Sequence, residues 1–419
     1  MPIKISFNGA LMSVGASAIL LESENERLVL DYGTRVREVV QKFPIPIEGK
    51  IDAILLSHGH LDHSGGLPIL TNKNNCRIYS LGINKELSEL LLLDSVKISH
   101  EEGTTLPFSQ KDVEKCVNYF NDVKYRVPFK IKNVEITYFD AGHIPGSAMI
   151  FLDFGDKTIL YTGDFNNIDT KLVKKFDEKI PKADVLITES TYSDRDHPDR
   201  KNEEKKFIQT VRETLDNNGV ALVAGFAVSR VQEVLLILDK YGIDFPIYID
   251  GMAKKATTII SKYPNLLRNA KDLDKALQNV RYVNKNHQRK KIIKESCVVL
   301  STSGMLNGGP IVWYLKKLYN RTNCSLIMTG YQLEDTPGRI LLETGRFIYN
   351  GLDIDVKMQV KRFDFSAHAG RSGLFDFIKR VSPEKIFCVH GDHTEEFANE
   401  LKENYDAIAP IANNRIFYI

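Results

Sequence analysis

The chain has 419 residues, of which 43% are hydrophobic and 26% charged, and its formal net charge is only +2. This length gives room for two domains with apolar cores, and so small a net charge does not by itself indicate nucleic-acid binding. No run approaches 18 apolar residues, which excludes a membrane-spanning helix, and five scattered cysteines without a CxxC favour a reducing, cytoplasmic compartment over thiolate metal sites.

The first predicted element is the apolar segment 10–21, which could be mistaken for a signal peptide. Ser13, Ser17 and several small residues interrupt it, which makes a poor signal-peptide core. The segment also continues into the apolar run 27–31. We therefore expect the two runs to form the first β-hairpin of the fold.

A buried strand over 51–56 comes next, and it runs directly into Ser57-His58-Gly59-His60-Leu61-Asp62-His63. Three of the chain's ten histidines and one carboxylate are concentrated there. Neutral imidazole and carboxylate are ligands that suit zinc, and no thiolate lies nearby. The pattern predicts part of a metal site; the alternative is an ordinary polar turn.

Three later apolar runs also end in a histidine or an aspartate, namely 134–139, 158–161 and 385–389. Loops at the carboxyl ends of strands gather at one rim of an α/β sheet, so these side chains should meet. The candidate ligands are His58, His60, Asp62, His63, His143, Asp164 and His390. One tetrahedral zinc does not need seven ligands, whereas two metals sharing a bridging carboxylate do.

The residues between the third and fourth of these motifs form an insertion, because the motifs on either side must share a domain. Its strands alternate with a helix in the manner of a parallel, Rossmann-like sheet, and no GxGxxG indicates a dinucleotide. The predicted domains are 1–193, the insertion 194–360, and the completing segment 361–419. The predicted elements of the insertion are strands 220–224, 247–250, 297–301 and 325–330, with a helix over 231–240.

The order Asp31, HxHxDH, His143, Asp164 resembles the metallo-β-lactamase superfamily. The segments 188–192, 365–369 and 389–392 resemble the additional motifs of its β-CASP nucleases, a group that includes RNase J and the endonuclease subunit of the cleavage and polyadenylation specificity factor. The resemblance covers essentially the whole chain. It implies an α/β fold: a metallo-β-lactamase αββα sandwich with an inserted Rossmann-like β-CASP domain.

The resemblance also implies roles for individual residues. Two zinc ions are expected, one held by His58, His60 and His143, the other by Asp62, His63 and His390, with Asp164 bridging them. Asp31 is expected to orient a ligand histidine, unless it is a plain turn residue. Asp62 and His368 are expected to take part in catalysis, His368 as a general acid kept protonated by Glu189. Ser303, Ser366, Arg230 and Arg339 are candidates for contacts with RNA phosphates, although such residues are usually ordinary turn and surface residues.

The implied function is a zinc-dependent ribonuclease acting on single-stranded RNA and leaving 5′-phosphate and 3′-hydroxyl ends. Cleavage inside the chain and 5′-to-3′ exonucleolysis are both open. The alternatives are a two-zinc nuclease acting on DNA, another two-zinc hydrolase such as a thioesterase or β-lactamase, and a non-catalytic scaffold homologue. The complete set of ligand positions favours an enzyme.

Two further segments have competing interpretations. The basic run 281–294, with Tyr282 within it, is either an RNA contact or a solvated helix face. The apolar end of the tail 413–419 either completes a strand or forms a homodimer interface.

Overall fold

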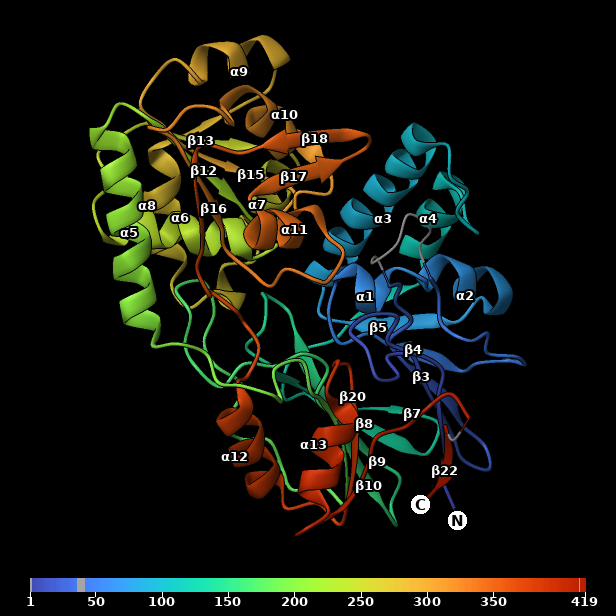
Figure 1. Cartoon of the computed structure of the whole chain (residues 1–419). Helices are drawn as coiled ribbons and strands as arrows, with labels where there is room; N and C mark the ends of the chain where they lie inside the picture. The colour runs from blue at the N-terminus through green and yellow to red at the C-terminus, as the bar shows by residue number, and fades with distance from the viewer. Residues whose placement is uncertain (1, 36–41, 414) are drawn as a thin grey trace. The chain divides into compact units, whose positions relative to one another are not determined.

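The computed structural model describes residues 2–35, 42–413 and 415–419, and it divides into two compact units (Figure 1). The first unit comprises the residues up to Asp169, Lys174–Asp196 and Ala367–Ile419. The second unit comprises Thr170–Val173 and His197–Ser366. The domain limits predicted from the sequence, 193/194 and 360/361, remain a prediction.

The first unit contains two seven-stranded sheets. The first has the order β22-β1-β2-β3-β4-β5-β6, with β22 Ile416–Tyr418, β1 Lys4–Phe7, β2 Ile19–Glu22, β3 Arg27–Leu30, β4 Ala53–Leu55, β5 Arg77–Ser80 and β6 Phe120–Asp122. The second has the order β21-β20-β11-β10-β9-β8-β7, with β21 Asp406–Ile408, β20 Lys385–Val389, β11 Val185–Glu189, β10 Thr158–Tyr161, β9 Ala148–Asp153, β8 Val134–Asp140 and β7 Phe129–Ile131. Both sheets mix parallel and antiparallel pairs.

The two sheets pack face to face, since the rings of Phe7 on β1 and Phe387 on β20 lie 5.0 Å apart. Helices cover the outer faces, which completes the predicted αββα sandwich. These helices are α1 Leu61–Ser64, α2 Leu67–Asn74, α3 Ile83–Glu102, α4 Gln110–Val117, α12 Arg371–Val381 and α13 Thr394–Leu401. Within the described part of the chain, no helix combines the length and the apolar character needed to cross a membrane.

The predicted first hairpin is present but shorter than expected. Strand β2 begins only at Ile19 and pairs with β3, Ile19 opposite Leu30. The residues before it form a loop in which Ala10, Met12 and Ala16 have positive φ, a backbone region that a strand cannot contain. Strand β1, which lies before this loop and pairs with β2, was not predicted from the sequence.

The chain's tail forms a strand, which is one of the two roles expected for it. Strand β22 pairs antiparallel with β1, Phe417 opposite Ile5. Asn414, within the predicted tail segment, lies outside the described residues. The alternative role of the tail, in a homodimer, remains a prediction.

The second unit is built on a six-stranded, all-parallel sheet, as the Rossmann-like pattern predicted. Its order is β14-β13-β15-β12-β16-β19, with β14 Val280–Tyr282, β13 Ile247–Asp250, β15 Cys297–Ser301, β12 Val220–Ala224, β16 Ser325–Met328 and β19 Gln359–Arg362. The central strands are fully buried, which is why each reads as an unbroken apolar run.

Helices and one hairpin surround this sheet (Figure 1). They are α5 Arg200–Asp216, α6 Arg230–Lys240, α7 Ala253–Ser261, η1 Pro264–Leu266, α8 Ala270–Gln278, α9 Asn286–Ile292, α10 Gly309–Leu318, α11 Pro337–Thr344 and the hairpin β17 Arg346–Tyr349 with β18 Leu352–Asp355. Most of the strands and the helix predicted for the insertion match the observed bounds within one residue, whereas β16 ends two residues early.

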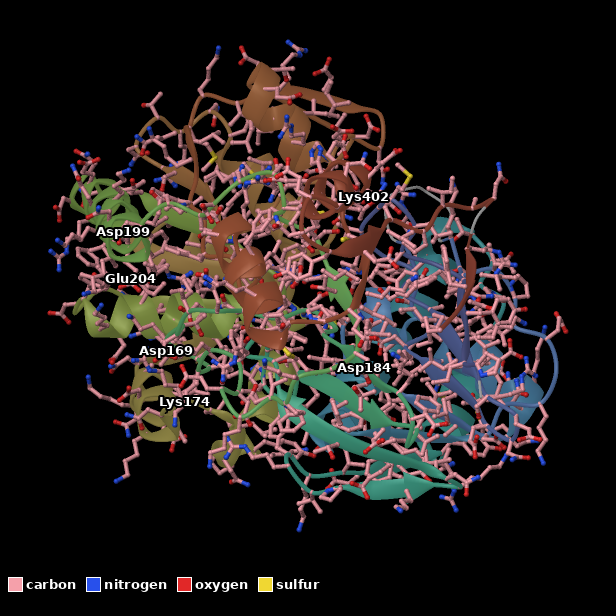
Figure 2. The ribbon with its side chains drawn as sticks, turned by 90° about the horizontal axis from the view of Figure 1, so that it is seen from below. Asp169, Lys174, Asp184, Asp199, Glu204 and Lys402 are labelled. Carbon is pink, nitrogen blue, oxygen red and sulfur yellow. The ribbon has the colours of Figure 1, made fainter. Side chains whose placement is uncertain are left out.

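A short excursion of the chain, Thr170–Val173, belongs to the second unit because buried carboxylates hold it there. Glu233 accepts hydrogen bonds from the backbone N–H groups of Lys171 and Leu172, at 3.0 and 2.8 Å. The ammonium of Lys171 lies 3.0 Å from the buried carboxylate of Glu204 on α5. Figure 2 labels Asp169 and Lys174, which flank this excursion, and Glu204.

Candidate metal centre

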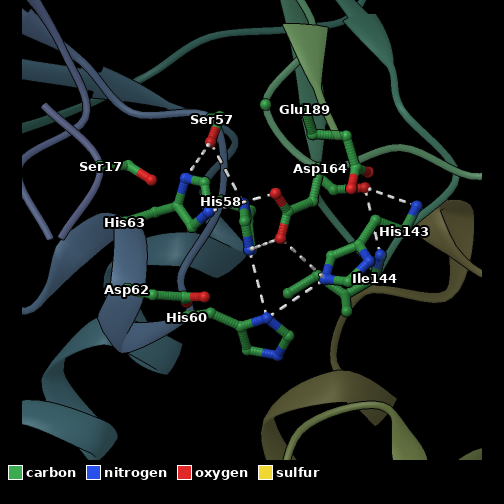
Figure 3. Close-up of polar contacts among 12 residues, drawn as sticks. Ser17, Ser57, His58, His60, Asp62, His63, His143, Ile144, Asp164 and Glu189 are labelled. Atoms are coloured by element: carbon green, nitrogen blue, oxygen red, sulfur yellow. Dashed lines mark hydrogen bonds and ion pairs between the residues drawn. The ribbon is translucent and has the colours of Figure 1, made fainter. Parts of the chain in front are cut away.

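The seven predicted ligands all lie in the first unit, on loops that follow strands or begin a helix. His58 follows β4, His143 follows β8, Asp164 follows β10 and His390 follows β20. His60 precedes the short helix α1, which carries Asp62 and His63. Figure 3 shows most of these side chains directed toward Asp164 at the centre. The structure thus brings together every residue that the strand-end argument selected.

One group of donors consists of three histidines. The Nδ1 atom of His60 lies 3.2 Å from Nε2 of His58 and 3.2 Å from Nε2 of His143. Both Nε2 atoms lie 3.7 Å from Oδ2 of Asp164. These four atoms therefore surround a common point.

A second group lies on the other side of the same carboxylate. Oδ1 of Asp164 is 3.3 Å from Nε2 of His63 and 3.7 Å from Nε2 of His390. Nε2 of His390 is also 3.6 Å from Oδ2 of Asp62. Each oxygen of Asp164 thus faces a different group, which is the arrangement that a bridging ligand requires.

The donors fit metal ions better than they fit one another. Among the described residues, the buried Nε2 atoms of His63 and His390 and Oδ1 of Asp164 make no hydrogen bond, and leaving such groups unpaired is costly. A tetrahedron with zinc–ligand distances of about 2.0–2.1 Å has edges of about 3.3 Å, close to the separations found here. All five cysteines are buried elsewhere without a disulfide partner, so the donor set is nitrogen and oxygen only.

Asp31 supports the second group from behind. Its carboxylate is fully buried and its Oδ2 accepts hydrogen bonds from Nδ1 of His63, the hydroxyl of Tyr161 and Oγ of Ser57, each at 2.7 Å. A proton on Nδ1 of His63 leaves the Nε2 lone pair directed at the centre. Asp31 is therefore placed to orient a ligand histidine, and its backbone φ of 56° is unusual for such a residue.

Two other histidines are oriented by groups that the sequence analysis missed. Nδ1 of His390 is 2.8 Å from Oγ of Ser17, and Nδ1 of His143 is 2.8 Å from the carbonyl oxygen of Ala367. The partners are 373 and 224 residues apart in the sequence, and a serine or a main-chain carbonyl carries no recognisable signal. Only the folded chain reveals them.

Burial and charge act differently on the candidate ligand histidines: burial opposes a charge on His63, but Asp164 and Asp31 outweigh burial and raise the pKa of His63 well above its usual range. Burial holds the pKa of His58 and of His143 well below the usual range, and the neighbouring imidazoles add to this effect. Burial alone would raise the pKa of Asp164, but His390 and His63 outweigh it and hold that pKa well below normal. Metal ligands must be deprotonated, so the ionised Asp164 and the neutral His58 and His143 are in the form that a metal cation binds.

His368 and Glu189 form the contact that was expected from the family pattern. Nδ1 of His368 lies 3.1 and 2.9 Å from the two oxygens of Glu189, whose side chain is buried. Burial opposes a charge on His368, but Glu189 and Asp164 outweigh it and raise the pKa of His368 to about 9. The ring of His368 lies 4.5 Å from that of His143, so an imidazole whose pKa is raised stands beside the candidate ligands.

The four candidates for RNA phosphate contacts all lie in the second unit. Arg230 begins α6, Ser303 follows β15, and Arg339 lies in the first turn of α11, so all three are on segments that follow the carboxyl ends of parallel strands. Ser366 is buried in the last residues of the unit. The hydroxyl of Ser303 bonds Asn307 and Arg339 pairs with Glu343, so their roles in RNA binding remain proposals.

The basic run 281–294 forms β14 and α9, and one of its cations already has a buried partner. Arg289 donates to both oxygens of Asp250, at 2.7 and 3.1 Å, and Asp250 is 1% exposed. Counting charges along the sequence therefore overstated the basic surface. Lys290 and Lys291 are exposed and remain candidates for RNA contacts.

Three family models match the chain. They describe the anti-Pycsar protein Apyc1 over residues 10–197, the Beta-Casp domain over 231–341 and the Zn-dependent metallo-hydrolase RNA specificity domain over 353–411. The last match includes both His368 and His390. The matched regions cover both units.

Individual proteins match over nearly the full length. The chain is 39% identical to the probable RNase MJ4 of Methanocaldococcus jannaschii, over 99% of this chain and 100% of that protein. It is 36% identical to RNase aCSPSF2 of Saccharolobus solfataricus, over 94% of this chain and 81% of the relative. A solved protein of unknown function from Enterococcus faecalis V583 shares the fold, with a TM-score of 0.66 at 14% identity and full coverage of both chains. The family expected from the motifs is confirmed: this chain belongs to the β-CASP metallo-hydrolases.

Proposed function

We propose that this protein is a zinc-dependent ribonuclease that hydrolyses phosphodiester bonds of single-stranded RNA and leaves 5′-phosphate and 3′-hydroxyl ends. One observation carries the proposal: two groups of converging donors share Asp164, and the imidazole of His368 lies beside them. This arrangement combines the means to activate water with the means to protonate a leaving group.

Two zinc ions would be held by the two groups, His58, His60 and His143 on one side of Asp164, and Asp62, His63 and His390 on the other. When bound, zinc lowers the pKa of water from 15.7 to about 7, so that water can attack phosphorus at neutral pH, and it offsets the charge of the phosphate. The chain's own part is to orient the imidazoles, through Asp31, Ser17 and the carbonyl of Ala367.

His368 supplies the proton that the leaving 3′ oxygen needs. Glu189 occupies Nδ1, so the proton on Nε2 is the one left to donate. The carboxylate stabilises the imidazolium before transfer and fixes the ring during it. Glu189 is itself held by the backbone N–H of Phe165, which donates to Oε1 at 2.7 Å.

RNA is favoured over DNA by the comparisons rather than by the metal site. The family model over residues 353–411 describes an RNA specificity domain, and two of the relatives named above are RNases. The seven donors, Glu189 and His368 are all in place, which argues against a scaffold that has lost its catalytic residues. Both an endonuclease and a 5′-to-3′ exonuclease are consistent with this site.

The test combines metal analysis with an end-labelled substrate. Elemental analysis of the purified chain should give close to two zinc ions; Asp164→Ala should lose both and Asp62→Ala should mainly weaken one. One RNA, labelled at either end, should be cut in its 5′-monophosphate and 5′-triphosphate forms. Internal cuts in both forms indicate an endonuclease, and mononucleotides released only from the monophosphate form indicate 5′-to-3′ exonucleolysis.

Other outcomes would contradict the proposal in distinguishable ways. A folded chain that binds one zinc or none overturns the two-metal site. A chain with two zincs that cuts single-stranded DNA of the same sequence faster than RNA supports the DNA alternative. Two zincs without cleavage of either nucleic acid supports the scaffold.

A further inference from the structure

Phe226 is an exposed aromatic residue at an edge of the second unit's sheet where ligands commonly bind. It lies in the loop between β12 and α6, directly beyond the carboxyl end of a central parallel strand. The residue is 37% exposed, although burying a phenylalanine would stabilise the folded chain. In open α/β sheets, ligands bind outside the carboxyl ends of the strands.

Two glycines of neighbouring loops lie against this ring. A Cβ on Gly330, after β16, would lie 3.2 Å from Cε2 of Phe226, and a Cβ on Gly304, after β15, would lie 3.4 Å from Cγ. The same atom on Gly304 would lie 3.1 Å from the backbone nitrogen of Phe226. The ring is therefore supported by the main chain of two other loops, and a Cβ at either glycine would be in tight contact with Phe226.

A buried amide fixes the two supporting loops to each other. Gln332 is 2% exposed, and its Nε2 donates to the carbonyl oxygens of Gly304, at 3.0 Å, and of Tyr331, at 3.2 Å. The support for Phe226 is thus held in place before any ligand arrives. A preorganised aromatic surface loses little conformational entropy on binding.

Exposure alone would not distinguish this residue. Phe245 is equally exposed, at 37%, and belongs to the same unit. It precedes β13, however, and because all strands of the sheet are parallel it lies at the opposite, amino-terminal edge. Single exposed apolar side chains are common on protein surfaces. Phe226 is distinguished by its position at the carboxyl edge of the sheet and by the two glycines that lie against its ring.

We propose that Phe226 is a stacking platform for an unpaired nucleobase of the RNA. The inference rests on the proposed function, and it adds a contact with a base to contacts with the phosphate backbone. Aromatic rings bind bases of single strands in a sequence-tolerant way, because every base has a π-face. Phe226 falls outside the regions that the family models match, which end at residue 197 and resume at 231.

The test is a comparison of Phe226→Leu with the matched control Phe245→Leu. Both variants are made in the zinc-loaded, full-length His368→Ala protein, so that the RNA survives the binding measurement. The ligands are a single-stranded RNA decamer and the same ribose-phosphate chain without bases. Stacking contributes about 1–3 kcal/mol per base, so Phe226→Leu should weaken binding of the RNA about 5- to 150-fold.

The abasic chain separates stacking from damage to the fold. Phe226→Leu should leave its affinity unchanged, and Phe245→Leu should change neither affinity. Phe226→Leu weakening both ligands equally, or neither, would overturn the proposal. Phe226→Trp gives a second measurement: in a Trp313→Phe background, where it is the chain's only tryptophan, its fluorescence should be quenched by the RNA and not by the abasic chain. No difference in quenching would also overturn it.

These readouts are independent of the proposed function. Base-dependent quenching by a protein that cleaves nothing would remove the ribonuclease proposal and leave the platform. If the chain cleaves RNA and Phe226→Leu binds the RNA decamer with unchanged affinity, the ribonuclease proposal stands and the stacking platform is overturned.

Discussion

Replacing Asp31 by asparagine changes one atom of the carboxylate behind the candidate metal centre. In the wild type, the groups that contact this carboxylate among the described residues are hydrogen-bond donors: Ser57 through N and Oγ, Tyr161 through its hydroxyl, and His63 through Nδ1. An asparagine must present its NH₂ group to some of them. The amide nitrogen faces either the backbone N–H of Ser57, donor to donor, or Nδ1 of His63.

The second orientation is the damaging one for zinc. If Nδ1 of His63 accepts a hydrogen bond from the amide, the proton of the neutral ring moves to Nε2, which is the atom directed at Asp164. The Nε2 atom of His63 can then bind zinc only after it loses this proton, which removes the favoured tautomer. Loss of such a supporting carboxylate costs about 10- to 100-fold in metal affinity, or about 1.4–2.7 kcal/mol. We expect this loss at the zinc site proposed for His63 and little change at the zinc site proposed for His58.

The assay is competition for zinc with a chromogenic chelator, which resolves a tight and a weakened site. Asp184→Asn is the matched control, in the same unit and labelled in Figure 2. Asp184 accepts hydrogen bonds from the backbone N–H and the hydroxyl of Thr158, both at 2.7 Å, and none from a histidine. It therefore tests the loss of short hydrogen bonds without a change of tautomer.

Two results would refute this reasoning. If Asp31→Asn binds two zincs with wild-type affinity, then Asp31 does not set the tautomer of His63. If Asp184→Asn weakens zinc to the same extent, the effect of Asp31 is a general loss of stability. Thermal unfolding of the metal-free variants gives the size of that general loss.

Three further outcomes are expected. His368→Ala should lower turnover about 10²–10⁴-fold with normal zinc content, measured by elemental analysis; a loss of metal would show that His368 is a ligand. Burial, with Asp177, raises the pKa of Asp140 to about 7, although Asp140 accepts a hydrogen bond from the N–H of Gly142. The folded chain therefore holds this proton more tightly than the unfolded chain, and the free energy of unfolding falls as pH rises from about 4 to about 7. In urea unfolding, Asp140→Asn should be more stable than the wild type by about 1–2 kcal/mol at pH 8 and by much less at pH 4.5, and equal differences at both pH values would contradict this. Replacing the lysine pair 290–291 by alanine should reduce the slope of log affinity against log salt by roughly 1.4 for single-stranded RNA. The control, alanine at the exposed lysine pair 316–317 on α10, should leave this slope unchanged. Identical slopes for the two variants would show that 290–291 is an ordinary solvated face.

Much of the fold could be predicted because buried strands read as unbroken apolar runs. The runs 385–389 and 220–224 became β20 and β12 with the predicted bounds, since each is almost wholly buried. The ligands could be predicted for a related reason. A histidine or aspartate directly after such a run stands at a sheet edge, and α/β sheets bring those edges together.

What could not be predicted depended on contacts between distant segments. Arg289 looks like surface charge in the sequence because its partner Asp250, 39 residues earlier, ends a buried strand. The strand Lys4–Phe7 has only four residues and lies before a loop with several left-handed residues, so neither its length nor its pattern distinguished it. Periodicity describes a segment, whereas pairing depends on what the rest of the chain places beside it.

The hydrogen bonds that orient the candidate ligand histidines also depend on contacts between distant segments. Each oriented histidine takes its Nδ1 partner from another part of the chain: His63 from Asp31, His143 from Ala367, and His390 from Ser17. These partners come from the beginning of the first sheet and from the segment after the insertion, so the tautomers are fixed only when the sandwich has closed around both. Zinc affinity should therefore depend on folding of the whole first unit rather than on the HxHxDH loop, since a site assembled from distant segments does not exist in the unfolded chain.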